Sequence, residues 1–217
     1  MEIKVMKRVL DRNRDMAARV REKLGVRNVI MINLISSPGA GKTSLLEKIC
    51  EHLSGEMRIA VIEGDVATDR DARRIEKYQV PVVLINTDGG CHLDSNSIDM
   101  ALREFDLDNL DVVFVENVGN LVCPAHFDLG ETFKLAVVST TEGDDKPIKY
   151  PMLFREAMAV VLNKTDLLIH TDFSHETFLA DMHQVNPGIP VFELSCRTGD
   201  GLDEFLEWIK LSVSKKV

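Results

Sequence analysis

Residues 29–53 carry the feature that most restricts how this chain can fold. An apolar run, VIMINLI, leads directly into the glycine-rich turn SSPGAGKT, and the helical stretch SLLEKICEHL follows. This succession matches the Walker A phosphate-binding loop in the strand–loop–helix context that the motif requires. Because such a loop joins a buried strand to a helix, the segment predicts an α/β fold with helices on the faces of a sheet.

Each residue type in the turn suits a phosphate group. Gly39 and Gly41 allow backbone N–H groups to surround the anion, and Lys42 can reach the β- and γ-phosphates. Thr43 offers a hydroxyl to Mg²⁺, and Ser36 replaces the first glycine of the usual pattern, a change that the turn tolerates. The predicted nucleotide-binding residues of the loop are Ser37, Pro38, Gly39, Ala40, Gly41, Lys42, Thr43 and Ser44.

Apolar runs rich in β-branched residues alternate with helical patterns along the rest of the chain. Further strands are predicted at 58–63, 82–86, 112–117, 134–139, 157–163 and 190–195, and helices at 42–53, 68–78, 95–105, 173–185 and 201–213. The strand runs lack polar alternation, as expected of strands buried on both faces. We therefore predict a doubly wound, mostly parallel seven-stranded sheet of the P-loop NTPase type.

The N-terminal 28 residues have the pattern of an amphipathic helix. Ile3, Met6, Leu10, Asn13, Ala17, Val20 and Leu24 recur at spacings of three and four residues. We expect residues 1–28 to pack on one domain formed by residues 29–217, with helix pairing as the alternative role.

Charge is unevenly spread along the chain. Residues 1–28 hold nine Lys/Arg and four Asp/Glu, a net charge of +5, so the total of −9 leaves −14 on the domain. A body this acidic argues against nucleic acid as a partner.

Composition argues against the membrane and secreted classes. The chain has 217 residues, of which 45% are hydrophobic and 28% charged, so it can bury a core without disulfides. No run approaches the roughly 20 apolar residues that span a bilayer, and the first residues lack the apolar stretch of a signal peptide. We expect a cytoplasmic protein without a membrane partner. In that compartment, the four scattered cysteines are candidate metal ligands or redox thiols.

The strand at 157–163 ends in a motif that selects a base. Asn163-Lys164-Thr165-Asp166 matches the N-K-x-D pattern of GTPases. The Asp166 carboxylate can accept hydrogen bonds from N1–H and the 2-amino group of guanine, which adenine does not offer. Lys164 would cover the base, and Asn163 would tie this loop to the phosphate loop. A weaker match to the S-A-K loop of GTPases adds Ser195, Cys196 and Arg197, so GTP is predicted over ATP.

Acidic residues at two other strand ends are candidates for holding Mg²⁺. Glu116 begins Glu-Asn-Val-Gly where GTPases place D-x-x-G, so Gly119 is predicted to contact the γ-phosphate. Asp65 is predicted to act near Mg²⁺ or the attacking water, with Asp69 as the alternative, and either could instead cap a helix. The predicted Mg²⁺ ligands are Thr43, Asp65 and Glu116, and the predicted catalytic residues are Lys42, Asp65 and Glu116.

Two further segments carry sulfur and imidazole donors. GGCHLD supplies Cys91 and His92, and CPAH supplies Cys123, with His126 and Cys50 as remaining candidates. These donors suit Zn²⁺ or Ni²⁺ rather than Mg²⁺, but neither segment has C-x-x-C spacing. One chain therefore offers an incomplete site that two protomers could share, and an exposed loop pair is the alternative. Cys123 follows Gly119 by four residues, at most about 14 Å, so movement at the γ-phosphate should reach the metal ligands.

Six segments together resemble one family: SSPGAGKTSL, EGDVATDRDARRI, GGCHLD, ENVGNLVCPAHFDLGE, TEGDDKPIKYP and NKTDL. They are similar to the HypB family, the nickel-incorporation GTPases of hydrogenase maturation, from about residue 29 onward. The resemblance implies a SIMIBI-class G domain, slow GTP hydrolysis, a homodimer on GTP binding, a nickel-delivery partner protein and delivery of nickel to the large subunit of [NiFe] hydrogenase. It also implies a shared Zn²⁺ or Ni²⁺ site of Cys91, His92 and Cys123, and a contact of Lys146 with the nucleotide of the partner protomer.

Three other functions stay open. A urease nickel chaperone GTPase shares the phosphate and base motifs but carries a C-P-H type metal motif. A GTPase chaperone for cobalamin enzymes leaves Cys91 and His92 without a purpose. A metal-binding module, in which the nucleotide only stabilises a dimer, would release no phosphate in a single-turnover assay.

Overall fold

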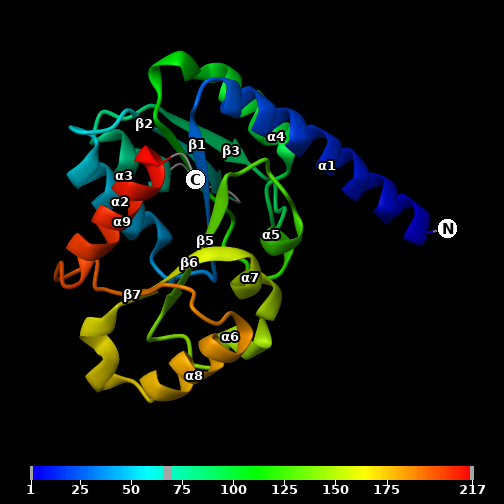
Figure 1. Ribbon diagram of the computed structural model, residues 1–217. Coiled ribbons are helices and arrows are strands. Elements are labelled where there is room, and N and C mark those ends of the chain that lie inside the picture. The colour runs from blue at the N-terminus through cyan, green and yellow to red at the C-terminus, as the bar shows by residue number, and fades with distance from the viewer. Residues whose placement is uncertain (1, 66–69, 216–217) are drawn as a thin grey trace.

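All the strands lie in one parallel sheet. The computed structural model describes the backbone of residues 2–65 and 70–215, and the side chains of residues 10–64 and 71–215. The strand order is β3-β2-β4-β1-β5-β6-β7, and every pair that the described residues form is parallel (Figure 1). The strands are β1 (Ile30–Ser36), β2 (Ile59–Asp65), β3 (Val82–Asn86), β4 (Val112–Glu116), β5 (Phe133–Ser139), β6 (Ala157–Asn163) and β7 (Val191–Glu193).

Helices connect the strands and cover both faces of the sheet. They are α1 (Glu2–Val26), α2 (Lys42–Leu53), α3 (Arg70–Glu76), α4 (Ser95–Ala101), α5 (Cys123–His126), α6 (Lys146–Lys149), α7 (Pro151–Glu156), α8 (His175–Val185) and α9 (Leu202–Ser214). Short 3₁₀ turns lie at Leu102–Glu104, Leu107–Asn109 and Thr165–His170. None of the helices in the described ranges has the length and apolar character needed to cross a membrane.

Alternate residues of each central strand belong to separate cores. On β4, Val112 and Phe114 pack with α2, α3 and α9, whereas Val113 and Val115 pack with α1 and α4 on the other face. That second face continues over β5 and β6, where α7 and α8 cover it through Phe154 and Phe178. A strand buried on both faces needs apolar residues at successive positions, which is what the central runs contain.

The predicted doubly wound, seven-stranded sheet is confirmed, with two corrections. The prediction that every strand is buried on both faces is wrong for β3, where Leu84 is 38% exposed because the strand lies at the edge of the sheet. The last strand, predicted at 190–195, ends at Glu193, because Ser195 turns back to bond its backbone N–H to the carbonyl of Asp200.

The helices largely follow the prediction. The helix predicted at 68–78 extends from Arg70 to Glu76, and its first predicted positions lie outside the described residues. The helix predicted at 95–105 is α-helical as far as Ala101 and then continues as a 3₁₀ turn. The sequence patterns did not predict α5, α6 and α7, which have four to six residues each.

Helix α1 lies along the body with its first turns extending beyond it (Figure 1). Its buried face consists of Asn13, Ala17, Val20 and Leu24, the last four positions of the predicted stripe. Helix α1 shares a hydrophobic core with α4, so the two parts are packed together. The division into residues 1–28 and 29–217 stays a prediction.

Candidate nucleotide and metal site

The predicted functional residues gather at one edge of the sheet. Strands β1, β2, β4 and β6 end there, and each is followed by one of the motifs singled out above. In open α/β sheets, ligands bind outside the carboxyl ends of the strands, at the point where the connections change direction. Here β1 is that point, since its neighbours are β4 and β5.

The phosphate loop is held in its wrapped conformation by glycines and by Lys42. Gly39 and Gly41 have φ of 80° and 99°, the left-handed region in which glycine is unstrained. The Lys42 ammonium is buried and donates to Ser36 Oγ at 2.8 Å. Burial lowers the pKa of Lys42, and the carboxylates of Glu116 and Glu63 oppose that shift. Ser36, at the usual glycine position, thus supplies the lysine with a partner.

A pocket of about 600 Å³ opens above this loop. It is lined by the phosphate loop, by the residues after β4 and by Lys164. It also contains Glu63, Asp71 and Arg74, which the sequence motifs did not single out as site residues. Arg74 is held by Glu47 and donates to Ser44 Oγ at 3.1 Å. The available signal for Glu63 was its place near the carboxyl end of a predicted strand, a place that it shares with Asp65 two residues further on.

Two buried carboxyl groups face Thr43 in this pocket. Glu63 on β2 and Glu116 on β4 are in register on adjacent strands, and Thr43 Oγ1 donates to Glu116 Oε1 at 2.8 Å. Burial and the nearby Glu116 raise the pKa of Glu63 to about 10, and burial also raises the pKa of Glu116. Among the described residues, Glu63 Oε1 and Glu116 Oε2 find no hydrogen-bond partner. Oxygen atoms of this kind are the ligands that Mg²⁺ prefers.

A second pocket, of about 360 Å³, adjoins the first and shares Gly41, Ser44 and Lys164 with it. Its walls include Asn163, Asp166, Ser195, Cys196 and Arg197, the residues predicted to read guanine. Phosphate and base motifs therefore line one continuous cleft of the size and polarity that a nucleotide requires.

Hydrogen bonds order the base loop. Asn163 Nδ2 donates to the carbonyl of Ala40 at 3.0 Å, which ties the base loop to the phosphate loop, and Asn163 Oδ1 accepts from the backbone of Cys196 at 3.2 Å. The Ser195 hydroxyl donates to Asp166 Oδ1 at 2.6 Å. Lys164 spans the cleft, and its ammonium donates to the carbonyl of Gly39 at 2.6 Å. The Asp166 carboxylate is thus oriented before any base is present.

The loop after β4 lies against the phosphate loop. A Cβ on Gly119 would lie 3.1 Å from Pro38 atoms, so only a glycine allows this approach without displacement. The neighbouring Asn117 accepts from the backbone N–H of Leu93 at 3.2 Å. One short loop therefore touches both the phosphate pocket and the segment that carries Cys91 and His92.

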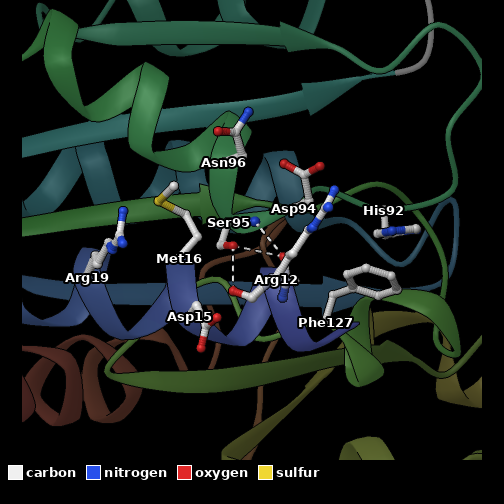
Figure 2. Close-up of a pocket in the computed structure, with 10 residues that line it drawn as sticks. Arg12, Asp15, Met16, Arg19, His92, Asp94, Ser95, Asn96 and Phe127 are labelled. Carbon is white, nitrogen blue, oxygen red and sulfur yellow. Dashed lines mark hydrogen bonds between the residues drawn. The ribbon is translucent and has the colours of Figure 1, made fainter. Parts of the chain in front are cut away.

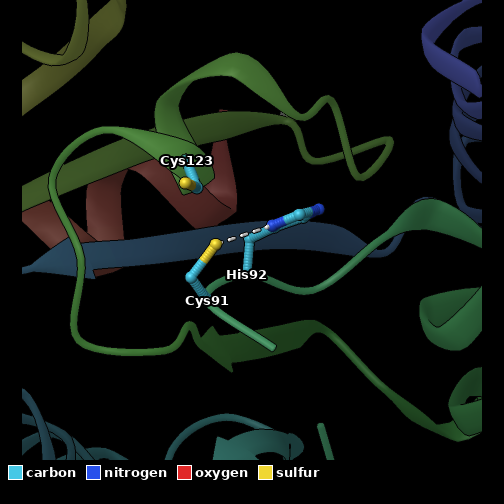
Figure 3. Close-up of side chains that lie close together, drawn as sticks. All are labelled: Cys91, His92 and Cys123. Carbon is cyan, nitrogen blue, oxygen red and sulfur yellow. Dashed lines mark hydrogen bonds between the residues drawn. The ribbon is translucent and has the colours of Figure 1, made fainter. Parts of the chain in front are cut away.

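Cys91, His92 and Cys123 come together as the predicted metal-ligand group (Figure 3). Their donor atoms all lie within 4.8 Å of one another, and Cys91 Sγ is 3.4 Å from His92 Nδ1. The contact with Cys91 is the main cause that raises the pKa of Cys123, and burial lowers the pKa of His92. A neutral imidazole beside two thiols is a donor set for Zn²⁺ or Ni²⁺.

The other candidate donors lie elsewhere. Cys50 lies on the buried face of α2, where burial raises its pKa to about 12, so it packs in the core as an apolar residue. His126 lines a different pocket, with Arg14 and Glu131. Lys146 lies over the ring of Tyr150, at 5.7 Å from the ring centroid, and lines neither nucleotide pocket of its own chain. The side chain of Asp65 and all of Asp69 lie outside the described residues.

Comparison with known proteins agrees with this arrangement. The family model described as "CobW/HypB/UreG, nucleotide-binding domain" matches residues 30–193. The hydrogenase maturation factor HypB of Azotobacter vinelandii is 48% identical over 208 residues, which cover 96% of this chain and 69% of that protein.

Solved structures give the same result. The crystal structure of HypB from Helicobacter pylori in complex with nickel has a TM-score of 0.88 at 34% identity, covering 94% of this chain and 96% of that one. HypB from Archaeoglobus fulgidus also has a TM-score of 0.88, at 35% identity, covering 94% of this chain and all of that one. The chain belongs to the HypB family of hydrogenase maturation factors, within the CobW/HypB/UreG group of nucleotide-binding proteins.

Proposed function

We propose that this chain is a GTP-hydrolysing nickel metallochaperone that helps insert nickel into the large subunit of [NiFe] hydrogenase. One observation carries the proposal: the loop after β4 places Gly119 against the phosphate loop and leads within four residues to Cys123 of the metal cluster. A nucleotide that moves this loop changes the position of a nickel ligand. The coupling explains why one small domain holds both sites.

GTP is the proposed substrate because the oriented Asp166 carboxylate matches two donors of guanine. In the proposed reaction, water attacks the γ-phosphorus in line, the bond to the β–γ bridging oxygen breaks, and GDP and phosphate leave with one proton released. Lys42 stabilises the charge that develops on the phosphate oxygens, aided by the backbone N–H groups of the loop. Turnover is expected to be slow, because the proposed protein acts as a timer for nickel delivery rather than as a metabolic catalyst.

The carboxyl groups of Glu63 and Glu116 and the hydroxyl of Thr43 fit a Mg²⁺ ion, because two of their buried oxygens lack partners among the described residues. When bound there, Mg²⁺ would neutralise charge on the β- and γ-phosphates. Asp65 is retained as a further proposed ligand from its place at the end of β2. Thr43 would face the ion through its hydroxyl oxygen while still donating to Glu116 Oε1, because Glu116 Oε2 is the oxygen that lacks a partner.

Nickel is the proposed cargo of the Cys91, His92 and Cys123 cluster, and Zn²⁺ is the alternative ion. A relative has been solved in complex with nickel, which supports the assignment. Three donors per chain leave a tetrahedral or square-planar ion incompletely coordinated, so we propose a site shared by two protomers of a GTP-dependent homodimer. Lys146 would then reach the nucleotide of the other protomer.

The proposed partners are a nickel-delivery protein and the hydrogenase large subunit, in the cytoplasm.

Single-turnover GTP hydrolysis tests the enzymatic part. Wild-type protein should release phosphate, and Lys42→Ala should release none above background. If wild-type protein binds GTP without releasing phosphate, the chain is a nucleotide-stabilised binding module instead.

Nickel titration tests the metal part. With a non-hydrolysable GTP analogue, one Ni²⁺ per two chains should bind and produce thiolate charge-transfer absorption. Cys91→Ala and Cys123→Ala should each abolish the absorption, and Cys50→Ala is the matched control that should not. One ion per chain that binds independently of Cys91 would contradict the shared site.

A further inference from the structure

Asn13 is a polar residue in the otherwise apolar stripe of α1. Its side chain is 8% exposed, and its stripe neighbours Ala17 and Val20 are fully buried. A leucine would continue the stripe but would leave the polar groups that bond to Asn13 unpaired. A fully apolar set of residues in their place would be about as stable as these buried polar groups. What such groups can add is a defined register between elements. The partners of Asn13 therefore indicate what it holds in place.

One set of partners lies at the start of α4. Asn13 Oδ1 accepts from the backbone N–H and from the hydroxyl of Ser95, both at 2.9 Å, and the Ser95 hydroxyl also donates to the backbone carbonyl of Asn13 at 2.8 Å. These bonds are the dashed lines at Ser95 in Figure 2. Ser95 follows His92 by three residues, and Asp94 between them caps α4 by accepting from the N–H of Ser97 at 2.7 Å. The segment that carries Cys91 and His92 is thus attached to α1 immediately after the ligands.

The other partner lies in the loop after α5. Asn13 Nδ2 donates to the carbonyl of Asp128 at 2.7 Å, and Asp128 follows Cys123 by five residues. Arg21 pairs with the Asp128 carboxylate at 2.7 Å. The loop also presses on the helix at Gly130, where a Cβ would lie 2.6 Å from the carbonyl oxygen of Ala17.

A single amide group therefore bonds to both ligand-bearing segments, which leave different strands of the sheet. The two segments also meet directly, because the His92 ring stacks on Phe127 with centroids 3.7 Å apart (Figure 2). Asn13, Ser95, His92 and Phe127 all line one cavity of about 670 Å³ between α1 and these segments. Asn117, which bonds to the N–H of Leu93, is a further link between the two segments, but it lies on the Cys123 side, whereas Asn13 holds both segments against α1.

We infer that Asn13 is a positioning residue of the metal cluster: its amide clamps the Cys91–His92 segment and the Cys123 segment so that the three donor atoms stay within 4.8 Å of one another. The inference rests on the proposed nickel function. Ligands that are already held together lose less conformational freedom on binding an ion, so the clamp raises nickel affinity without touching the ion. Asn13 lines neither nucleotide pocket, so GTP affinity should not depend on it.

The test compares Ni²⁺ binding to the full chain, followed by thiolate charge-transfer absorption. Asn13→Leu should weaken Ni²⁺ affinity about tenfold, the lower end of the effect of removing a group that orients metal ligands, because Asn13 acts through the backbone on either side of them. GTP affinity should stay unchanged within about twofold. Leu24→Ala is the matched control, because Leu24 is buried on the same helix and makes no side-chain bond to either segment. That control should keep the Ni²⁺ affinity of the wild type.

A second measurement needs no variant. In the wild-type protein, hydrogen exchange at the Ser95 N–H, which bonds to Asn13, should slow when Ni²⁺ binds. Unchanged exchange there, or equal Ni²⁺ affinity in Asn13→Leu and wild-type protein, overturns the clamp while leaving the nickel function in place. If the wild-type protein shows no Ni²⁺ binding that depends on Cys91, the nickel function and the clamp both fail.

Discussion

Glu63 and Glu116 occupy matching positions on the adjacent strands β2 and β4, and their carboxyl groups are buried together beside Lys42. Burial makes it costly for both carboxyl groups to be charged, even though the Lys42 ammonium favours their charged forms. Such a pair of carboxyl groups lowers the stability of the protein but raises its affinity for a cation.

Replacing Glu63 with glutamine should therefore stabilise the nucleotide-free protein at alkaline pH. The pKa of Glu63 is raised to about 10, so the stability from its protonated form is complete below about pH 4.5 and is lost as the pH rises toward 10. Glu63→Gln stays neutral, and wild-type protein loses about 1.4 kcal/mol for each pH unit between the two pKa values. The gain of the variant in unfolding free energy should therefore grow by about 4 kcal/mol between pH 5 and pH 8. Urea denaturation at both pH values measures it.

Glu47→Gln is the matched control for that experiment. Hydrogen bonds from Arg74 and Lys77 lower the pKa of Glu47, so this variant should lose stability at pH 8 rather than gain it. Glu63→Gln should also weaken Mg²⁺-dependent nucleotide binding. If the difference in unfolding free energy between Glu63→Gln and wild type is the same at both pH values, the buried pair of carboxyl groups does not destabilise the protein by repulsion.

Asp166→Asn should change the preferred base. The amide can donate where the carboxylate accepts, so the variant suits xanthine and loses its match to guanine. We expect GTP affinity to fall at least about a hundredfold and xanthosine triphosphate to bind more tightly than GTP. Competition titration with the two nucleotides measures this. Undiminished GTP affinity would remove the base assignment.

Gly41→Ala should disrupt the phosphate loop and the base loop together. The residue has φ of 99°, and a Cβ would lie 2.4 Å from Asn163 Nδ2, so the bond from Asn163 to Ala40 must break. We expect a loss of about 1–3 kcal/mol in unfolding free energy and more than tenfold in GTP affinity. Gly55→Ala, which meets no atom within 4 Å, should stay within about 0.5 kcal/mol of wild type.

The cysteines should differ in their rates of alkylation. Cys91 is exposed, whereas burial raises the pKa of Cys50 to about 12 and that of Cys196 to about 11. The thiolate is the reactive form, so Cys91 should be modified first and Cys50 only on unfolding. Ni²⁺ should protect Cys91 and Cys123 alone. Peptide mass spectrometry resolves the four sites, and equal rates at Cys50 and Cys91 would contradict the placement of Cys50 in the core.

The amino-acid sequence by itself determined the succession of strands and helices along the chain, the phosphate loop and the residues of the base loop. These features depend on local patterns: apolar runs, glycines that permit φ of 80° to 99°, and motifs of a few adjacent residues. It did not predict α5, α6 and α7, whose four to six residues are too short for a helical period to show.

Only the tertiary structure decided which distant residues complete the sites. Glu63 meets Glu116 because β4 lies between β1 and β2 in the sheet. Asn13 bonds to Ser95 and Asp128, which lie 82 and 115 positions further along the chain, because α1 packs across two loops. Strand order and helix docking arise from burial of apolar surface over the whole chain, which no short segment specifies. A glutamate at a strand end or an asparagine in an apolar stripe acquires its role from the neighbours that this packing brings.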